Sequence, residues 1–220
     1  KIKDEYPEYR KIYLDMRRFD VVGPMNGARI NMKLLKGRPW ERPNTKSQNI
    51  IGIYAAKRCS EYTEIGDVID TETLFEIKQR PINGILSFDI PKGAWSIFVI
   101  FNTPNGGEDA TKDYLNPLVK EATQILVDTV YEPHYRRYKN EFGKTILGFF
   151  SDEPRFGNQK GTESSIGKTE MVLPWRANLE EELPFELKYL PLLFVKGNKK
   201  DAEIRYEYMN LITRLYSENF

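Results

Sequence analysis

The sequence lacks most of the residues on which redox, metal and triad chemistry depend. It has one cysteine, Cys59, which rules out an intramolecular disulfide and makes a zinc site unexpected. It also has one histidine, His134, which stands beside tyrosine and arginine and is expected on a helix surface. Because there is no Gly-x-Ser-x-Gly elbow either, a hydrolase triad is not expected.

An excess of charge and long apolar runs are missing as well. The 33 basic and 32 acidic residues leave a net charge of +1, which does not indicate a nucleic-acid or membrane-surface partner. No apolar run reaches membrane-spanning length, and the chain does not open with a signal peptide. No phosphate-binding loop or dinucleotide fingerprint is present, so the sequence predicts neither a cofactor nor a metal. The compartment stays undetermined.

The first part of the chain has the alternating pattern of β-strands. Alternation of apolar and polar residues predicts a strand at 28–34. The range 49–57, rich in Ile and Tyr, and the shorter range 74–78 are further candidate strands. The range 84–102 is expected to form a β-hairpin around a turn at its middle, and glycines 23 and 27 mark an earlier bend. We therefore predict an antiparallel β-domain over residues 1–103.

The pattern becomes helical after a polar linker at 103–110, where we place the domain boundary. Residues 117–132 have apolar side chains at helical spacing, with Asn116 as the expected N-cap and Pro133 expected to end or kink the helix. A final helix is indicated by four apolar residues on one face, Ile204, Tyr208, Leu211 and Leu215. The range 104–220 is thus expected to be a second, α/β unit.

The stretch 145–151 is expected to be the central strand of this second unit. Its apolar run suits a strand buried on both faces, as in a parallel α/β sheet. Asp152 and Glu153 follow directly, and Pro154 cannot continue a central strand. Carboxylates in this position lie where barrel enzymes keep their catalytic groups, although Asp-Glu-Pro can also be a solvated turn.

Glycoside hydrolysis is the reaction that best suits these carboxylates. It needs a proton donor for the leaving oxygen and a second carboxylate as nucleophile or base. Glu153 is the candidate donor. Successive side chains of a strand point to opposite faces, so Asp152 is expected to hydrogen-bond a sugar hydroxyl or to orient Glu153.

Several short motifs follow one another between residues 84 and 216. They are Phe88-Asp-Ile-Pro-Lys-Gly-Ala-Trp95, Asp113-Tyr-Leu-Asn-Pro117, Thr129-Val-Tyr-Glu-Pro133, Gly148-Phe-Phe-Ser-Asp-Glu-Pro154, Leu173-Pro-Trp175 and Arg205-Tyr206. Their order resembles a family of large bacterial glycoside hydrolases similar to the α-L-rhamnosidases of family 106. The resemblance implies a (β/α)8 TIM-type barrel that carries an inserted β-domain, with Glu153 as the acid. Asp152 stands where related enzymes have Asn.

The residues expected to contact the sugar lie on loops and loop ends. Asn158 belongs to a long polar loop after Glu153, the position from which substrate loops come. Tyr114 and Trp175 are candidates for stacking on a sugar ring. The alternative function is a non-catalytic carbohydrate-binding or structural module that uses these two rings together with Trp95, although Trp95 is expected in the core.

The barrel predicted from the resemblance is incomplete in this chain. A complete barrel needs about 250 residues, more than the second unit holds. The strands beside 145–151 and the second catalytic carboxylate are therefore expected in the remaining segments of the same barrel. The predicted partners are those segments and a carbohydrate substrate, and the chain alone is expected to be inactive.

Overall fold

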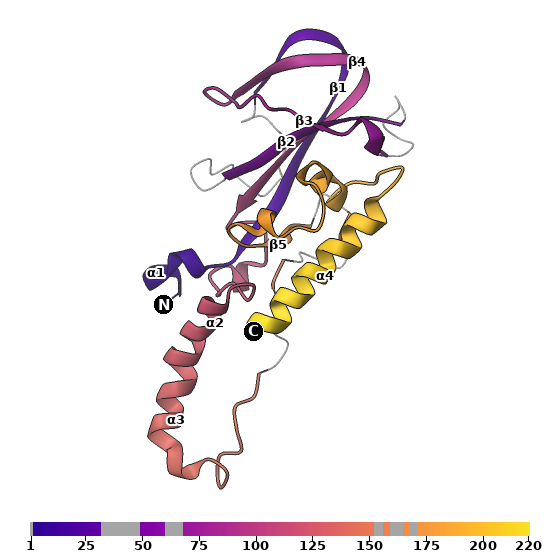
Figure 1. Ribbon diagram of the computed structural model, residues 1–220. Coiled ribbons are helices and arrows are strands. Elements are labelled where there is room, and N and C mark those ends of the chain that lie inside the picture. Colours follow the sequence, from indigo (N-terminus) through magenta and orange to yellow (C-terminus); the bar gives the residue numbers. More distant parts are fainter. Residues whose placement is uncertain (1, 32–48, 60–67, 152–155, 159–164, 168–170) are drawn as a thin grey trace.

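The computed structural model describes residues 2–31, 49–59, 68–151, 156–158, 165–167 and 171–220. Five strands form one antiparallel sheet in the order β3-β2-β4-β1-β5 (Figure 1). The strands are β1 (Ile12–Asn31), β2 (Asn49–Lys57), β3 (Phe75–Glu76), β4 (Ile85–Thr103) and β5 (Leu173–Trp175). The helices are α1 (Ile2–Glu5), α2 (Lys120–Leu126), α3 (Glu132–Tyr138) and α4 (Asp201–Asn219), with a π-helical turn, Val127–Tyr131, between α2 and α3.

The fold is therefore mixed α/β, and its sheet is the predicted antiparallel one. The strand predicted at 49–57 has the bounds of β2, and that at 74–78 contains the shorter β3. The hairpin predicted at 84–102 is wrong, because β4 runs through its expected turn without interruption. The bend expected at 23–27 likewise lies inside β1, and the two long strands pair with each other along almost their whole length.

The turn-forming residues of the two strands face each other, which explains the wrong hairpin. Gly23 pairs with Gly93, and the register shifts between Gly23 and Met25. A Cβ on Gly23 would collide with the Pro91 carbonyl oxygen, and Gly93 has a φ of +115° that other residues rarely adopt. The glycines therefore bend the paired strands at one level, as β-bulges do, and neither strand turns back on itself.

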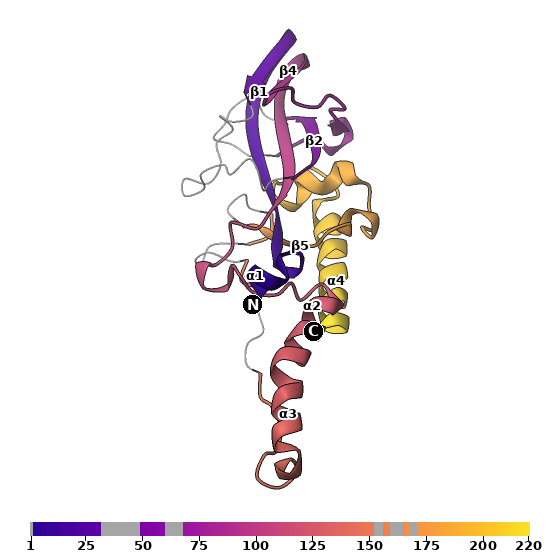
Figure 2. The same cartoon turned by 90° about the vertical axis from the view of Figure 1, so that its left-hand side faces the viewer.

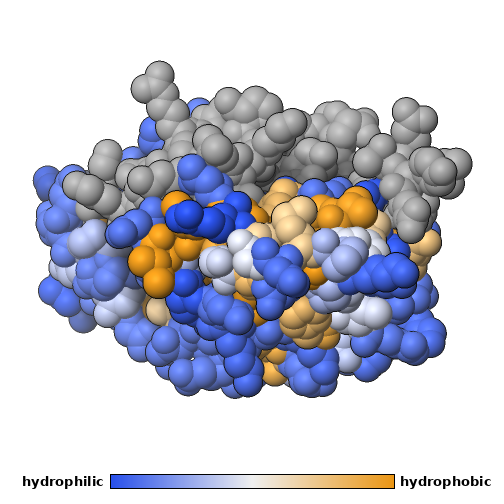
Figure 3. Space-filling model, turned by 90° about the horizontal axis from the view of Figure 1, so that it is seen from above, coloured by the Kyte–Doolittle hydropathy of each residue, from blue (hydrophilic) through white to orange (hydrophobic). Residues whose placement is uncertain are grey.

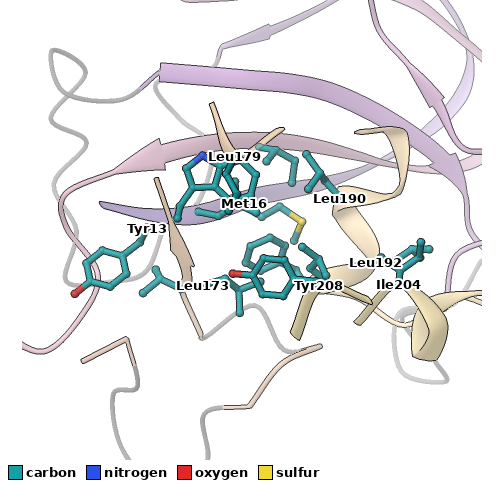
Figure 4. Close-up of a cluster of buried hydrophobic side chains, with 14 of the residues drawn as sticks. Tyr13, Met16, Leu173, Leu179, Leu190, Leu192, Ile204 and Tyr208 are labelled. Carbon is teal, nitrogen blue, oxygen red and sulfur yellow. The ribbon is translucent and has the colours of Figure 1, made fainter. Parts of the chain in front are cut away.

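The sheet buries apolar side chains on both faces. The first core lies between the sheet and the C-terminal part of the chain, including α4 (Figure 4), with the labelled members Tyr13, Met16, Leu173, Leu179, Leu190, Leu192, Ile204 and Tyr208. The second core lies on the opposite face, where Ile97, Val99 and Phe101 pack with Leu86 and Phe88 from the other end of β4. The distal halves of β1 and β4 thus curl back over the sheet that their proximal halves form (Figure 1).

The first core takes residues from both sides of the boundary predicted at 103–110. β5 pairs with the start of β1, where Trp175 is opposite Ile12. The Tyr208 hydroxyl of α4 donates a hydrogen bond of 2.5 Å to the Pro174 carbonyl oxygen. The ranges 1–103 and 104–220 therefore share a core in this structure.

The final helix is confirmed as α4. Its buried residues include all four that the spacing predicts, Ile204, Tyr208, Leu211 and Leu215, with Ile212 added. This apolar stripe packs on the first core, so α4 is stabilised by the sheet. No helix within the described ranges is both long and apolar enough to cross a membrane.

The helix predicted at 117–132 is present with different ends. It begins at Lys120, and it continues through Pro133 to Tyr138. Proline has no N–H for the hydrogen bond of an α-helical turn, and the π-helical turn directly before it takes up the disruption. This helix and residues 139–151, which we call the arm, project from the rest of the molecule, which we call the body (Figures 1 and 2).

Residues 145–151 are not the buried strand that their apolar run predicts. They return along the arm without regular structure after Ile146, and Phe149 packs on the Tyr131 and Phe142 rings at centroid distances of 4.6 and 5.6 Å. Leu147 and Phe150 are 91% and 86% exposed. The prediction fails because a central strand needs neighbours on both sides, and none of the described segments lies there.

Candidate functional site

The chain is firmly held just after the predicted catalytic pair. Asp152 and Glu153 themselves lie outside the described residues. Phe156 is the next described residue, and its side chain is buried. Its carbonyl oxygen accepts a hydrogen bond of 2.6 Å from the Lys11 ammonium. The position of the chain three residues beyond Glu153 is therefore fixed by the start of β1.

Two further residues hydrogen-bond the backbone of Gly157. Its carbonyl oxygen accepts hydrogen bonds from the Glu108 backbone N–H, at 2.7 Å, and from the Tyr13 hydroxyl, at 3.4 Å. Its φ of +70° favours glycine, and a Cβ at this position would collide with the Thr111 hydroxyl. The loop 104–116 and β1 thus pack closely against this backbone. Glycine at position 157 leaves the room that this contact needs.

Lys11 is the centre of this cluster. Its side chain is 1% exposed, and its ammonium lies 5.3 Å from the Tyr114 ring centroid and 5.7 Å from that of Phe156. Burial of an ammonium is costly, and the carbonyl contact together with two cation–π contacts offsets that cost. The Lys11 backbone N–H also donates to the Tyr114 carbonyl oxygen at 3.0 Å, so both residues are placed by backbone pairing.

Tyr13 stays a neutral hydrogen-bond donor in this cluster. Burial, followed by the nearby Glu108 carboxylate, raises the pKa of Tyr13 to about 12, and a hydrogen bond with Thr111 and the charge of Arg10 act in the opposite direction. Its ring packs edge-on against Phe156 at a centroid distance of 5.5 Å. The phenol therefore contributes an uncharged O–H at neutral pH.

Buried charges continue along the same face of β1. Lys11, Asp15 and Arg17 alternate with apolar residues, and Asp15 and Arg17 are 2% and 5% exposed. The Asp15 carboxylate accepts a hydrogen bond of 2.8 Å from the Met16 backbone N–H, and the Arg17 guanidinium lies 5.0 Å from the Phe101 ring centroid. This part of the sheet is thus unusually polar for a buried surface.

Two of the predicted sugar-contacting residues belong to this cluster. Tyr114 is 59% exposed, so much of its ring faces solvent while Lys11 contacts it. The Asn158 amide donates a hydrogen bond of 3.0 Å to the carbonyl oxygen of Val172, the residue directly before β5, which ties the beginning of the predicted substrate loop to that strand. Tyr114 thus shares the Lys11 ammonium with Phe156, and Asn158 directly follows Gly157 in the chain.

The expectation of an exposed Trp175 is wrong. Its side chain is fully buried in the first core, so no face of its ring is open to a sugar. Trp175 ends β5, opposite Ile12, and its carbonyl oxygen accepts a hydrogen bond of 2.8 Å from the Asn116 amide. The proline before it suggested a loop, but it occupies a short strand at the edge of the sheet, where proline is tolerated.

Lys11, Glu108 and Gly157 were not identified from the sequence. Lys11 does continue the alternation of β1 outward from Tyr13, so its face could have been deduced. Its burial could not, because its partner Phe156 is 145 positions away in the chain.

The described residues contain no group of three or more His, Cys, Asp and Glu side chains that could hold a metal ion. His134 lies on α3, where its Nδ1 is 2.6 Å from the Val130 carbonyl oxygen of the same helix, and Cys59 is exposed. No family model, curated protein or solved structure matches the chain.

Proposed function

We propose that this chain is a segment of a glycoside hydrolase in which Glu153 protonates the oxygen of the leaving group. The anchoring of residues 156–158 is the observation that carries the proposal. A general acid acts only when it is held at the glycosidic oxygen, and a buried hydrogen bond from Lys11 fixes the chain three residues beyond Glu153. The exposed ring of Tyr114 beside it offers a surface on which a sugar can stack.

The other polar groups receive supporting roles in this proposal. Asp152 hydrogen-bonds a sugar hydroxyl or orients Glu153, since adjacent side chains cannot both face one bond. Asn158 stabilises the loop that follows and contacts the sugar through the part of its amide that is free of Val172. The proposal needs no cofactor, because two carboxylates suffice for glycoside hydrolysis.

The arm supports the barrel part of the proposal. A helix followed by an extended apolar segment is the order of one step in a (β/α)8 barrel. Leu147 and Phe150 are almost fully exposed, and Phe149 already packs on the helix. We infer that the remaining segments of the same barrel pair with residues 145–151 and cover these two side chains.

A non-catalytic carbohydrate-binding module is the second candidate, and Tyr114 is the residue that favours it. Such a module usually presents several aromatic rings on one exposed surface. Trp95 is 8% exposed and Trp175 is fully buried, so only Tyr114 of the three proposed rings is available. The enzyme is therefore the better-supported proposal.

The decisive experiment uses a protein that carries this segment together with the rest of the barrel. Glu153→Gln should lower kcat about 10²–10⁴-fold on glycosides with poor leaving groups, because it removes the proton and keeps the shape. Glu121→Gln, at an exposed position of α2, is the matched control and should leave kcat unchanged. Normal turnover in Glu153→Gln would exclude Glu153 as the acid.

The 220-residue chain by itself should hydrolyse none of a panel of aryl glycosides, including rhamnosides. The second carboxylate has to stand about 5–10 Å from Glu153, and the missing barrel segments are expected to supply it. Hydrolysis by this chain that disappears in Glu153→Gln would show that the site is complete without those segments.

A further inference from the structure

A group of charged side chains surrounds Asp20 at the bend of the β1–β4 pair. Arg18 donates to both carboxylate oxygens of Asp20, at 3.0 and 3.3 Å, and the buried Ser96 hydroxyl donates to one of them at 2.6 Å. Arg58, directly after β2, places its Nη1 3.7 Å from the other oxygen. Strands β1 and β4 and the residue that follows β2 therefore contribute to this cluster.

Arg58 is the unusual member of the cluster. Its side chain is 5% exposed, and its buried Nε and Nη2 have no hydrogen-bond partner among the described residues. These two nitrogens form the edge of a guanidinium that binds a carboxylate or phosphate through two parallel hydrogen bonds. Buried polar groups are nearly always paired, so two adjacent donors without a partner suggest a ligand.

Arg17 provides an informative contrast on the opposite face of the sheet. Its buried Nε and Nη2 also lack partners in the described part of the chain, but its guanidinium lies over the Phe101 ring, which partly satisfies the charge. No aromatic ring is found in that position for Arg58 among the described residues. The position of Arg58 is set instead by Asp20, whose side chain is 33% exposed and so connects the cluster to solvent.

We propose that the Nε–Nη2 edge of Arg58 binds an oxyanion, with Asp20 and Ser96 holding Arg18 and Arg58 in place. The two parallel donors of this edge suit a ligand with one negative group. A carboxylate of an acidic sugar and a free phosphate both have the oxygen spacing that this edge requires. The site lies nine residues along β1 from Lys11, about 30 Å, and does not depend on the role of Glu153.

Thermal unfolding of the 220-residue chain can test this site, with phosphate, galacturonate or galactose added at constant ionic strength. We expect a saturable rise of Tm with phosphate or galacturonate and none with galactose. The anion that raises Tm more shows whether the ligand is an acidic sugar or a free phosphate. No saturable rise with either anion, or an equal rise with galactose, would overturn the proposal.

Substitutions test whether the anion binds at Arg58. Arg58→Met should weaken anion binding about tenfold or more, and Arg58→Lys should weaken it too because an ammonium lacks the paired donors. Arg80→Met is the control, since Arg80 is 53% exposed in a surface ion pair with Glu76, and it should bind as the parent does. Undiminished binding in a folded Arg58→Met chain would refute the site.

A direct measurement remains decisive even if Arg58→Met fails to fold. The Nε–H resonance of Arg58, assigned by its absence in Arg58→Lys, should shift with the same saturation curve as Tm. A resonance that does not move while Tm rises would place the anion elsewhere and reject the proposal.

Discussion

The body and the arm both contain runs of apolar residues, and only the body buries them. Phe98, in the run along β4, is fully buried, whereas Phe150, in the run at 146–150, is 86% exposed. Seen from above, the exposed apolar groups of the body are separated by polar ones (Figure 3). The arm instead exposes neighbouring apolar side chains. An apolar run therefore becomes a buried strand only where other strands and helices are available to cover it.

The same substitution in both regions gives the largest expected difference. Phe98→Ala should lower the free energy of unfolding by about 3–5 kcal/mol, because it leaves a cavity in the first core. Phe150→Ala should change it by less than about 0.5 kcal/mol, as is usual at exposed positions. Chemical denaturation of both variants measures the two values. Similar losses would mean that the arm is covered in solution.

The junction between the regions should show a smaller effect. The Asn116 side chain is 2% exposed, donates to the Trp175 carbonyl oxygen at 2.8 Å and accepts from the Leu118 N–H at 3.1 Å. Asn116→Ala removes both of these buried hydrogen bonds and should cost about 1–3 kcal/mol of unfolding free energy. Asn140→Ala, at an exposed position of the arm, is the control. An equal effect of both changes would show that the junction does not depend on this side chain.

Alkaline pH should weaken the body through Tyr13. Its pKa is raised to about 12 in the folded chain, so its contribution to stability is complete below the ordinary value of about 10. That contribution is lost as the pH rises from about 10 through about 12. The unfolding free energy should therefore fall over this range, and Tyr13→Phe should make the fall shallower.

Denaturant titrations at several pH values test this, and phenolate absorbance of the two proteins locates the ionisation of Tyr13. Tyr54, whose pKa burial also raises to about 12, and Tyr208, whose pKa burial raises well above its ordinary value, remain in both proteins and contribute to the residual slope. Identical slopes with and without the Tyr13 hydroxyl would contradict the prediction.

The smallest stability effect is expected for a charge placed on the arm. Leu147 is 91% exposed, so Leu147→Lys should leave the free energy of unfolding within about 0.5 kcal/mol. It should nevertheless reduce the fluorescence of a dye that binds exposed apolar surface. Val22→Lys, at an isolated position of the body that is 70% exposed, should reduce it less. The reverse order would place the apolar surface on the body.

The elements that local pattern determines could be predicted from the sequence. The spacing of Ile204, Tyr208, Leu211 and Leu215 predicts α4 because a helix repeats within a few residues. The Ile- and Tyr-rich run at 49–57 predicts β2, again from residues close together in the sequence. In both cases the residues that identify the element lie close together in the sequence.

The wrong predictions depend on residues far apart in the chain. Glycines 23 and 93 each suggested a turn, and only their pairing shows that they form one bend. The run at 146–150 suggested a strand, whose formation depends on segments beside it. At the site, the sequence indicates Tyr114 and Asn158, but the hydrogen bond from Lys11 to Phe156 joins residues 145 positions apart and leaves no local signal.

The pairing of β1 with β4 also determines the order in which the chain can fold. The pair closest in sequence, Asn31 and Ile85, encloses β2 and β3, and every other pair out to Tyr13 and Thr103 encloses more. Closing the first loop costs the most entropy, and each later pair adds little to that cost. The β1–β4 pairing should therefore form from the Asn31–Ile85 end toward the Tyr13–Thr103 end. It should form slowly, because folds dominated by long-range contacts fold slowly. During synthesis, β1 cannot pair with β4 until β4 has left the ribosome.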